Sequence, residues 1–224
     1  MKSLKLGLSL TSMKYGAWSP AEESNLEAWY KYQTGITLNG SDVSAWADSS
    51  SNSFNMVQAT ASEQPAYNSG AIQFTAADVH NLGSASDITL SGAFTVGIKL
   101  NPDVSNVTVI GSNTTTNEFF KISTSTSLRF KTDGSQVDIS LDSGSFVGDN
   151  YLVITRNSSN LITLYKNGVA QSDTETLAGT ADINAIGVRR TDLNPYDGTI
   201  SEIQIYDTES AALTANVNTY LSNL

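Results

Sequence analysis

Residues 161 to 173 read LITLYKNGVAQSD, and this stretch decides the fold. Branched and apolar residues lead into Asn167-Gly168, and the chain continues through Val169. An Asn-Gly pair between two such runs favours a tight type I′ turn, because both central residues of that turn need a positive φ. The stretch therefore predicts a strand, a turn and a second strand.

The same strand signals recur along the chain. Apolar residues alternate with other residues over 94–100, 128–131 and 137–141, which predicts half-buried strands. The run YLVITRN (151–157) is apolar on both faces and predicts a central strand. The only convincing helix closes the chain, where Ser210 can cap a stripe of apolar residues spaced three or four positions apart. These patterns indicate an all-β protein with a short C-terminal helix.

Composition excludes several classes of function. The 224-residue chain has no cysteine and a single histidine, His80, so thiolate and histidine-cluster metal sites are excluded. Its net charge of −10 repels phosphate backbones and anionic lipids, so we expect neither nucleic acid nor a membrane surface as partner. No stretch approaches the ~20 apolar residues that a membrane helix needs, which predicts no membrane insertion.

The first twenty residues differ from the rest of the chain. They carry three lysines and no acid, which leaves −13 for the remainder, and their leucines alternate with polar residues. We expect residues 1–24 to form an extended arm ahead of one sandwich domain, residues 25–224. Addition of the arm as a strand to a neighbouring subunit is favoured over packing on its own domain. The expected assembly contacts are Leu4, Lys5, Leu6, Leu8, Leu10 and Trp18.

A series of weak motifs appears in order from residue 26 to residue 222. These motifs are LEAWYKYQTGITLNGSDVSAWADSSSNSFNMVQATASEQPAY, AIQFTAADVHNL, GAFTVGIKLNP, ITLYKNGV and GTISEIQIYD. Together they resemble the laminin-G-like, concanavalin-A-like family. The resemblance implies an antiparallel β-sandwich of the jelly-roll type, in which the Asn-Gly hairpin is framework and Trp29 and Trp46 belong to the core.

The leading LKLGLSL segment and the Trp-x-Asp segment resemble accessory virion proteins of tailed phages in particular. This resemblance implies a virion protein of the head or tail. Its partners would be capsid or tail proteins and further copies of the chain.

Catalytic patterns are weak. Glucanases of the resembled fold use Glu-x-Asp-x-Glu along one strand, whereas the nearest match here, Asp138 to Asp142, lacks both glutamates and has Ser140 at the centre. His80 has no Gly-x-Ser-x-Gly elbow to accompany it, so a structural role is expected. We therefore predict a protein without enzymatic activity.

One loop offers candidate binding residues. The segment RRTDLNPYDG (189–198) combines two arginines and a tyrosine, which could hydrogen-bond and stack on a sugar, with oxygen ligands suited to Ca²⁺. An ordinary turn-rich loop is the favoured alternative, since Asn-Pro and Asp-Gly are common turn formers. The candidate sugar contacts are Arg189, Arg190 and Tyr196, and the candidate Ca²⁺ ligands are Asp192, Asn194 and Asp197.

Three functions remain open from the sequence. The first is a non-catalytic structural or accessory protein of a phage virion, anchored by its arm. The second is a lectin-like module that binds host glycans through loops at one end of the sandwich, and the two are compatible. A glycoside hydrolase is a distant third, because the paired carboxylates are missing.

Overall fold

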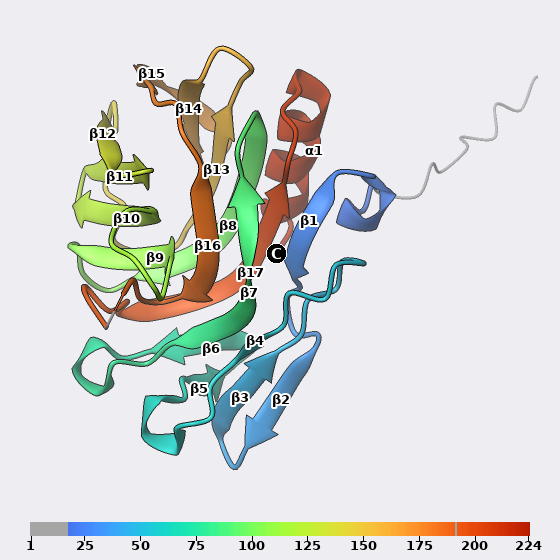
Figure 1. Ribbon diagram of the computed structural model, residues 1–224, viewed down its shortest axis with the longest axis vertical. Helices are drawn as coiled ribbons and strands as arrows, with labels where there is room; N and C mark the ends of the chain where they lie inside the picture. The colour runs from blue at the N-terminus through green and yellow to red at the C-terminus, as the bar shows by residue number, and fades with distance from the viewer. Residues whose placement is uncertain (1–17, 191) are drawn as a thin grey trace, which may run out of the picture.

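Two layers of antiparallel strands face one another across a hydrophobic core in the computed structural model, which describes residues 18–190 and 192–224 (Figure 1). One layer runs in the order β12, β11, β10, β9, β16, β7, β4 and β3, with β2 on the outer edge of β3. The other runs β15, β14, β13, β8 and β17, and both β1 and β6 pair with the far edge of β17. Strand β5 pairs with both β3 and β6 and so joins the layers.

The strands are β1 (Leu26–Tyr30), β2 (Ile36–Asn39), β3 (Asp42–Trp46), β4 (Met56–Val57), β5 (Ala66–Asn68), β6 (Ala71–Phe74), β7 (Leu82–Leu90), β8 (Phe94–Pro102), β9 (Val107–Gly111), β10 (Phe119–Thr124), β11 (Ser127–Thr132), β12 (Ser135–Ser140), β13 (Asn150–Arg156), β14 (Leu161–Lys166), β15 (Val169–Thr176), β16 (Ala181–Ile186) and β17 (Gly198–Tyr206). The helices are the 3₁₀ turns η1 (Pro20–Glu22), η2 (Ala61–Glu63) and η3 (Ala76–Asp78), and the α-helix α1 (Ala211–Leu221).

The core lies between the layers and follows the alternation of the strands. In β11 every second residue is buried, so Leu128 and Phe130 face inward while Arg129 and Lys131 face outward. Phe94 of β8 and Phe120 of β10 meet across the core with ring centroids 6.0 Å apart. Because inward positions come from both layers, the core is continuous from one layer to the other.

The predicted hairpin is confirmed. Strands β14 and β15 flank a turn in which Asn167 has φ 51° and Gly168 has φ 80°, as a type I′ turn requires. The predicted central strand is also confirmed, since β13 lies between β8 and β14. The predicted antiparallel β-sandwich with a short C-terminal helix is therefore the fold of this chain.

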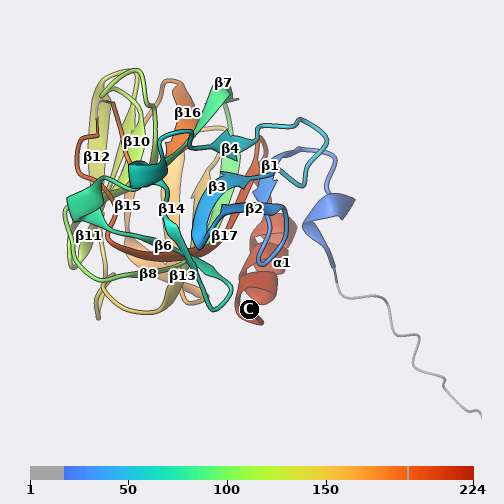
Figure 2. The same ribbon diagram turned by 90° about the horizontal axis from the view of Figure 1, so that it is seen from below.

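Helix α1 covers the outer face of the layer that contains β8 and β13 (Figures 1 and 2). The Ser210 side chain accepts a hydrogen bond from the Leu213 amide at 3.1 Å, which confirms the predicted cap. Gly97 lets the helix approach closely, because a Cβ there would lie 2.5 Å from Val217 Cγ1. Among the described residues, no helix combines the length and the apolar character required to cross a bilayer.

Arg156 closes one end of the sandwich from inside. It is fully buried, and its guanidinium lies 4.8 Å from the Phe94 ring centroid. Three of its nitrogens donate to the carbonyls of Leu90 (3.1 Å), Gly92 (2.7 Å) and Gly179 (2.7 Å), with a longer contact to Leu177. These carbonyls belong to the β7 end, the β7–β8 turn and the β15–β16 connection, so one side chain holds parts of both layers together.

We expect Arg156→Lys to lower the free energy of unfolding by about 2 kcal/mol or more, because a lysine cannot reach this fork of carbonyls and leaves buried acceptors unpaired. Urea unfolding followed by fluorescence measures the change. The exposed Arg190 offers a matched control, since Arg190→Lys should shift stability by less than about 0.5 kcal/mol. Equal stabilities of the two variants would contradict the role given to Arg156.

Candidate functional site

The loop between β16 and β17 does not present the surface that its sequence predicts. Tyr196 is fully buried, its ring meets Phe74 edge-to-face at 5.8 Å, and its hydroxyl donates to the Thr199 carbonyl at 3.2 Å. Burial raises the pKa of the Tyr196 hydroxyl well above its usual value, with Asp103 and Asp197 adding to the effect. The prediction that Tyr196 stacks on a sugar is therefore wrong, because the ring belongs to the core.

The two arginines of the loop lie in different surroundings. Arg189 is half-buried and lies 4.3 Å from the centroid of the Phe119 ring, with Nη2 donating to Asn194 Oδ1 at 2.7 Å. Arg190 is exposed, and its amide donates to the Ser112 carbonyl at 2.7 Å. Arg189 thus belongs to the outer face of β10, whereas Arg190 marks the exposed side of the loop.

The candidate calcium ligands also point to different neighbours. The side-chain oxygen of Asn194 accepts a hydrogen bond from Arg189. The positive guanidinium would repel a Ca²⁺ ion bound to the same oxygen. Asp192 borders a polar groove, and the Asp197 carbonyl accepts from the Asp103 amide at 3.0 Å. Residues 18–190 and 192–224 contain no group of three or more His, Cys, Asp or Glu side chains that could hold a metal ion. Calcium binding by this loop therefore gains no support from the geometry.

The carboxylates of the glucanase-like segment have structural partners. Arg129 donates to both oxygens of Asp138, at 2.8 and 2.7 Å, and this pairing lowers the pKa of Asp138. Asp142 accepts from the amide and the hydroxyl of Ser172. His80 accepts from the Thr75 amide through Nδ1 at 3.1 Å, which is a structural use of the ring. Each of these groups therefore takes part in a local structural contact.

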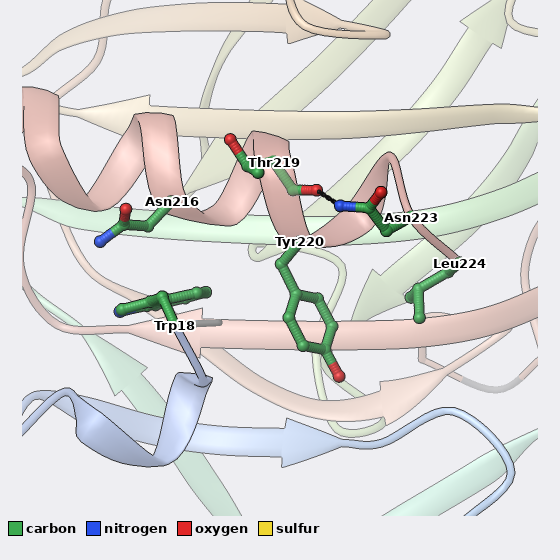
Figure 3. A pocket seen from close by; sticks show the side chains of 6 residues that line it. All are labelled: Trp18, Asn216, Thr219, Tyr220, Asn223 and Leu224. Carbon is green, nitrogen blue, oxygen red and sulfur yellow. Dashed lines mark hydrogen bonds between the residues drawn. The ribbon is translucent and has the colours of Figure 1, made fainter. Parts of the chain in front are cut away.

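An aromatic pocket lies between α1 and the segment that enters β1 (Figure 3). Trp18 and Tyr220 meet edge-to-face there, with ring centroids 6.1 Å apart, and Trp18 Nε1 donates to Glu23 at 2.9 Å. This contact corrects the expectation for Trp18, which packs on the helix of its own domain. The other expected arm contacts, Leu4, Lys5, Leu6, Leu8 and Leu10, lie outside the described residues.

The pocket measures about 420 Å³ and is mainly apolar, with amide and hydroxyl groups around the rings. Figure 3 shows Asn216 on one side of Trp18, and Asn223 donating to the carbonyl of Thr219, at 2.7 Å. The residues that line it are Trp18, Asn216, Thr219, Tyr220, Asn223 and Leu224.

A buried carboxylate lies beneath this pocket. Glu202 of β17 is fully buried and accepts hydrogen bonds from Trp29 Nε1, the Tyr32 amide and the Gln204 side chain. Its burial raises its own pKa, and its charge together with burial raises the pKa of Tyr220. With its pKa raised, Tyr220 is protonated at neutral pH, so its ring lines the pocket as part of a neutral side chain.

A second hollow, the polar groove, lies between β4, β7 and the 189–198 loop. It measures about 430 Å³ and is lined by amides and carboxylates that largely bond one another, as when Gln58 donates to Asn81 at 2.8 Å and to Glu63 at 3.1 Å. Without an aromatic ring and with its polar groups already paired, this groove suits a sugar less well than the aromatic pocket.

Sequence reasoning missed most of the pocket. Asn216, Thr219 and Asn223 lie on or just after the predicted helix, and only their position opposite its apolar stripe signals a polar outer face. That Trp18 covers this face depends on how η1 folds back against β1, which no local motif announces.

The family model described as the concanavalin A-like lectin/glucanases superfamily matches residues 68–216. No characterised protein sequence matches significantly. Domain 4 of AbnA, an extracellular arabinanase from Geobacillus stearothermophilus solved with arabinotriose, is similar in structure, with TM-score 0.63 and 19% identity over 88% of this chain and 98% of that one.

Two further structures are similar. The binding domain of Paraclostridial Mosquitocidal Protein 1 gives TM-score 0.60 and 14% identity over 92% of this chain, which spans 53% of that one. The heptameric SAP-like pentraxin of Limulus polyphemus gives TM-score 0.50 and 15% identity over 63% of this chain and 75% of the pentraxin. At these identities the likeness concerns the fold.

The Arg129–Asp138 pair has a testable pH dependence. Because the folded pKa of Asp138 is lowered, the pair stabilises the fold above about pH 4, the unfolded value, and this contribution disappears as the pH falls through the folded pKa. Both side chains are about one-third exposed, so we expect Asp138→Asn to cost at most about 1 kcal/mol at pH 7. Urea unfolding at pH 7 and pH 2 should show the difference from wild type shrinking at the lower pH; a difference that grows there would contradict the assignment.

Proposed function

The chain belongs to the concanavalin A-like lectin/glucanases superfamily, and we propose that within it this protein is a non-catalytic glycan-binding module. The aromatic pocket is its proposed sugar site. The observation that carries the proposal is the pairing of Trp18 and Tyr220 at a pocket rimmed by the side chains of Asn216, Thr219 and Asn223.

This arrangement matches the chemistry of a sugar ring. A pyranose or furanose has an apolar face of C–H groups that packs on an aromatic ring, and hydroxyls around its edge that exchange hydrogen bonds with amides. The Asn216 and Asn223 amides offer both donors and an acceptor, and the half-buried Trp18 offers the ring. The arabinotriose bound to the similar arabinanase domain makes a short neutral oligosaccharide a sensible first probe.

The non-catalytic part of the proposal is supported by the way the described carboxylates are used. Asp138 is paired with Arg129, Asp142 with Ser172, and Glu202 is enclosed by three donors. Retaining and inverting glycosidases both need two carboxyl groups facing the scissile bond. The aromatic pocket has no carboxylate among its lining residues.

Titration with neutral oligosaccharides, arabinotriose included, tests the proposal by tryptophan fluorescence and calorimetry. We expect Trp18→Ala and Asn223→Ala each to weaken binding about tenfold, which corresponds to about 1.4 kcal/mol. Trp18→Phe keeps an aromatic face and should retain most of the affinity.

Tyr32→Ala is the matched control, because Tyr32 is a partly exposed aromatic outside the pocket and its amide contact with Glu202 survives the change. The proposal fails if a broad panel of glycans shows no binding, or if Tyr32→Ala weakens binding as much as Trp18→Ala. Release of reducing sugar by the pure protein would overturn the non-catalytic part.

A second role is compatible with the first, and we propose it on the charge of the arm. Residues 1–20 carry three lysines and no acid ahead of a body with 22 Asp and Glu residues. Such a basic arm suits attachment to an acidic surface on a different protein. On this proposal the chain is an accessory virion protein of a tailed phage, held as a homo-oligomer on capsid or tail proteins.

Deletion of residues 2–17 tests this role while Trp18 stays in place. We expect the truncated chain to disappear from purified virions while its melting temperature stays unchanged, because the deleted residues would serve attachment. Replacement of Lys2, Lys5 and Lys14 by Gln should reduce incorporation in the same direction. Full incorporation of the truncated chain, or absence of the intact chain from virions, would contradict the role.

A further inference from the structure

Four cationic side chains gather on the outer face of β10 and β11, and we call them the cationic face: Lys121, Arg129, Lys131 and Arg189. In the β10–β11 register Lys121 lies opposite Arg129, and Phe119 lies opposite Lys131. Residues directly opposite one another on neighbouring strands share a face of the sheet. The inward neighbours Phe120 and Phe130 fill the core, which fixes this face as the outer one.

Within the described residues, only one of these four cations forms an ion pair with an acidic side chain. Arg129 pairs with Asp138, and neither Lys121, Lys131 nor Arg189 forms an ion pair with any residue in the described ranges. Like charges directly opposite on a sheet are destabilising, so Lys121 opposite Arg129 has a cost. A face with three unpaired cations is unusual in a chain whose net charge is −10.

Lys121 is the key member. It exposes only 7% of its surface, yet no described residue accepts a hydrogen bond from its ammonium group. Burial and the guanidiniums of Arg189 and Arg129 lower the pKa of Lys121. The ammonium nitrogen itself is not enclosed, so the stem of Lys121 is buried while its charged end reaches the surface, where it is open to a ligand.

Two further polar groups at this face lack partners. The buried Nε of Arg189 has no acceptor among the described residues, and neither does the buried hydroxyl of Thr108. Thr108 of β9 lies opposite Lys121 in the β9–β10 register, so its side chain is on the same face. Buried polar groups are normally hydrogen-bonded, so these two unsatisfied groups beside the cations indicate an incompletely paired site.

The Phe119 ring and its neighbours fix the position of Arg189 on this face. Phe119 points outward but exposes only 2% of its surface, because Arg189 lies over its ring and Lys131 Nζ lies 5.9 Å from its centroid. Gly111 makes room for this stack, since a Cβ there would lie 3.1 Å from Arg189 Cβ. Arg189 is therefore held in place before any ligand arrives.

We propose that the cationic face binds a single anionic group, a carboxylate or a sulfate, carried on a sugar. The unpaired ammonium of Lys121 and the guanidinium edge of Arg189 would share the anion, with Lys131 at its rim. This site lies on the opposite layer from the aromatic pocket, and it does not depend on that pocket being a sugar site (Figures 1 and 2).

The charge of the whole molecule decides the kind of ligand. With 22 acidic residues against 12 basic ones, the protein repels a long polyanion such as a nucleic acid. Because salt screens distant charges, a short ligand with one charge interacts mainly with the four cations nearby. An acidic sugar fits this condition, and its hydroxyls can bond the Ser123 hydroxyl at the same face.

Calorimetry and NMR titration with three probes test the proposal: sodium glucuronate, glucose 6-sulfate and glucose. We expect one or both anionic probes to bind and glucose to bind at least tenfold more weakly, with the affinity falling as salt rises from 50 to 300 mM. Binding of glucuronate alone identifies a carboxylate site, and binding of the sulfate ester alone identifies a sulfate site. Each of these results supports the anion site.

The variants separate a binding residue from a structural one. Lys121→Met and Arg189→Met should each weaken binding of the anionic probe about tenfold or more. Lys121→Met should leave the melting temperature unchanged or raise it, because it removes a cation facing Arg129. Asp138→Asn removes the competing carboxylate and should strengthen binding.

Lys166→Met is the charge-matched control, because it removes one positive charge from the β14–β15 hairpin, outside the cationic face. The proposal is overturned if no anionic probe binds, if glucose binds as well as they do, or if Lys166→Met weakens binding as much as Lys121→Met. If Trp18→Ala loses binding of neutral oligosaccharides but keeps glucuronate binding, the aromatic pocket and the cationic face bind their ligands independently.

Discussion

The buried Arg156 guanidinium is the interaction on which the closed end of this sandwich depends. A charge taken fully out of water is expensive, and here backbone carbonyls from three separate segments compensate it. The chain has no cysteine, so no covalent link can do the same work. Arg156 holds the carbonyls of Leu177 and Gly179, and this fixes the chain just before β16. Because β16 pairs with β9, the loop that follows β16 begins beside β9.

The position of β16 determines how the next loop packs on the outer face of β9 and β10. The Gly187 amide donates to the Val109 carbonyl at 2.9 Å, and the Thr108 amide donates to the Asn194 carbonyl at 2.8 Å, so the loop folds against β9. Arg189 is thereby laid over Phe119, and Tyr196 is turned into the core beside Phe74. One loop thus supplies both a core residue and a member of the cationic face.

The two candidate sites lie on opposite layers and use different chemistry. The aromatic pocket is formed where α1 covers β8 and β13, and it offers aromatic rings and side-chain amides. The cationic face is formed on the outer side of β10 and β11, where charge is concentrated and mostly unpaired. Since the sites share no lining residue, substitutions in one are expected to add independently to substitutions in the other.

The sequence by itself determined the features that depend on neighbours in the chain. The Asn167-Gly168 turn, the alternation in β8 and β11 and the Ser210 cap are local rules, because φ preference, strand pleat and capping act within a few residues. Only the tertiary structure decided that Tyr196 is core, that Trp18 packs on Tyr220, and that Lys121 lies beside other cations without an ion pair in the described residues. Each of these depends on segments far apart in sequence, and burial is a property of what the fold brings against a side chain rather than of the residue type.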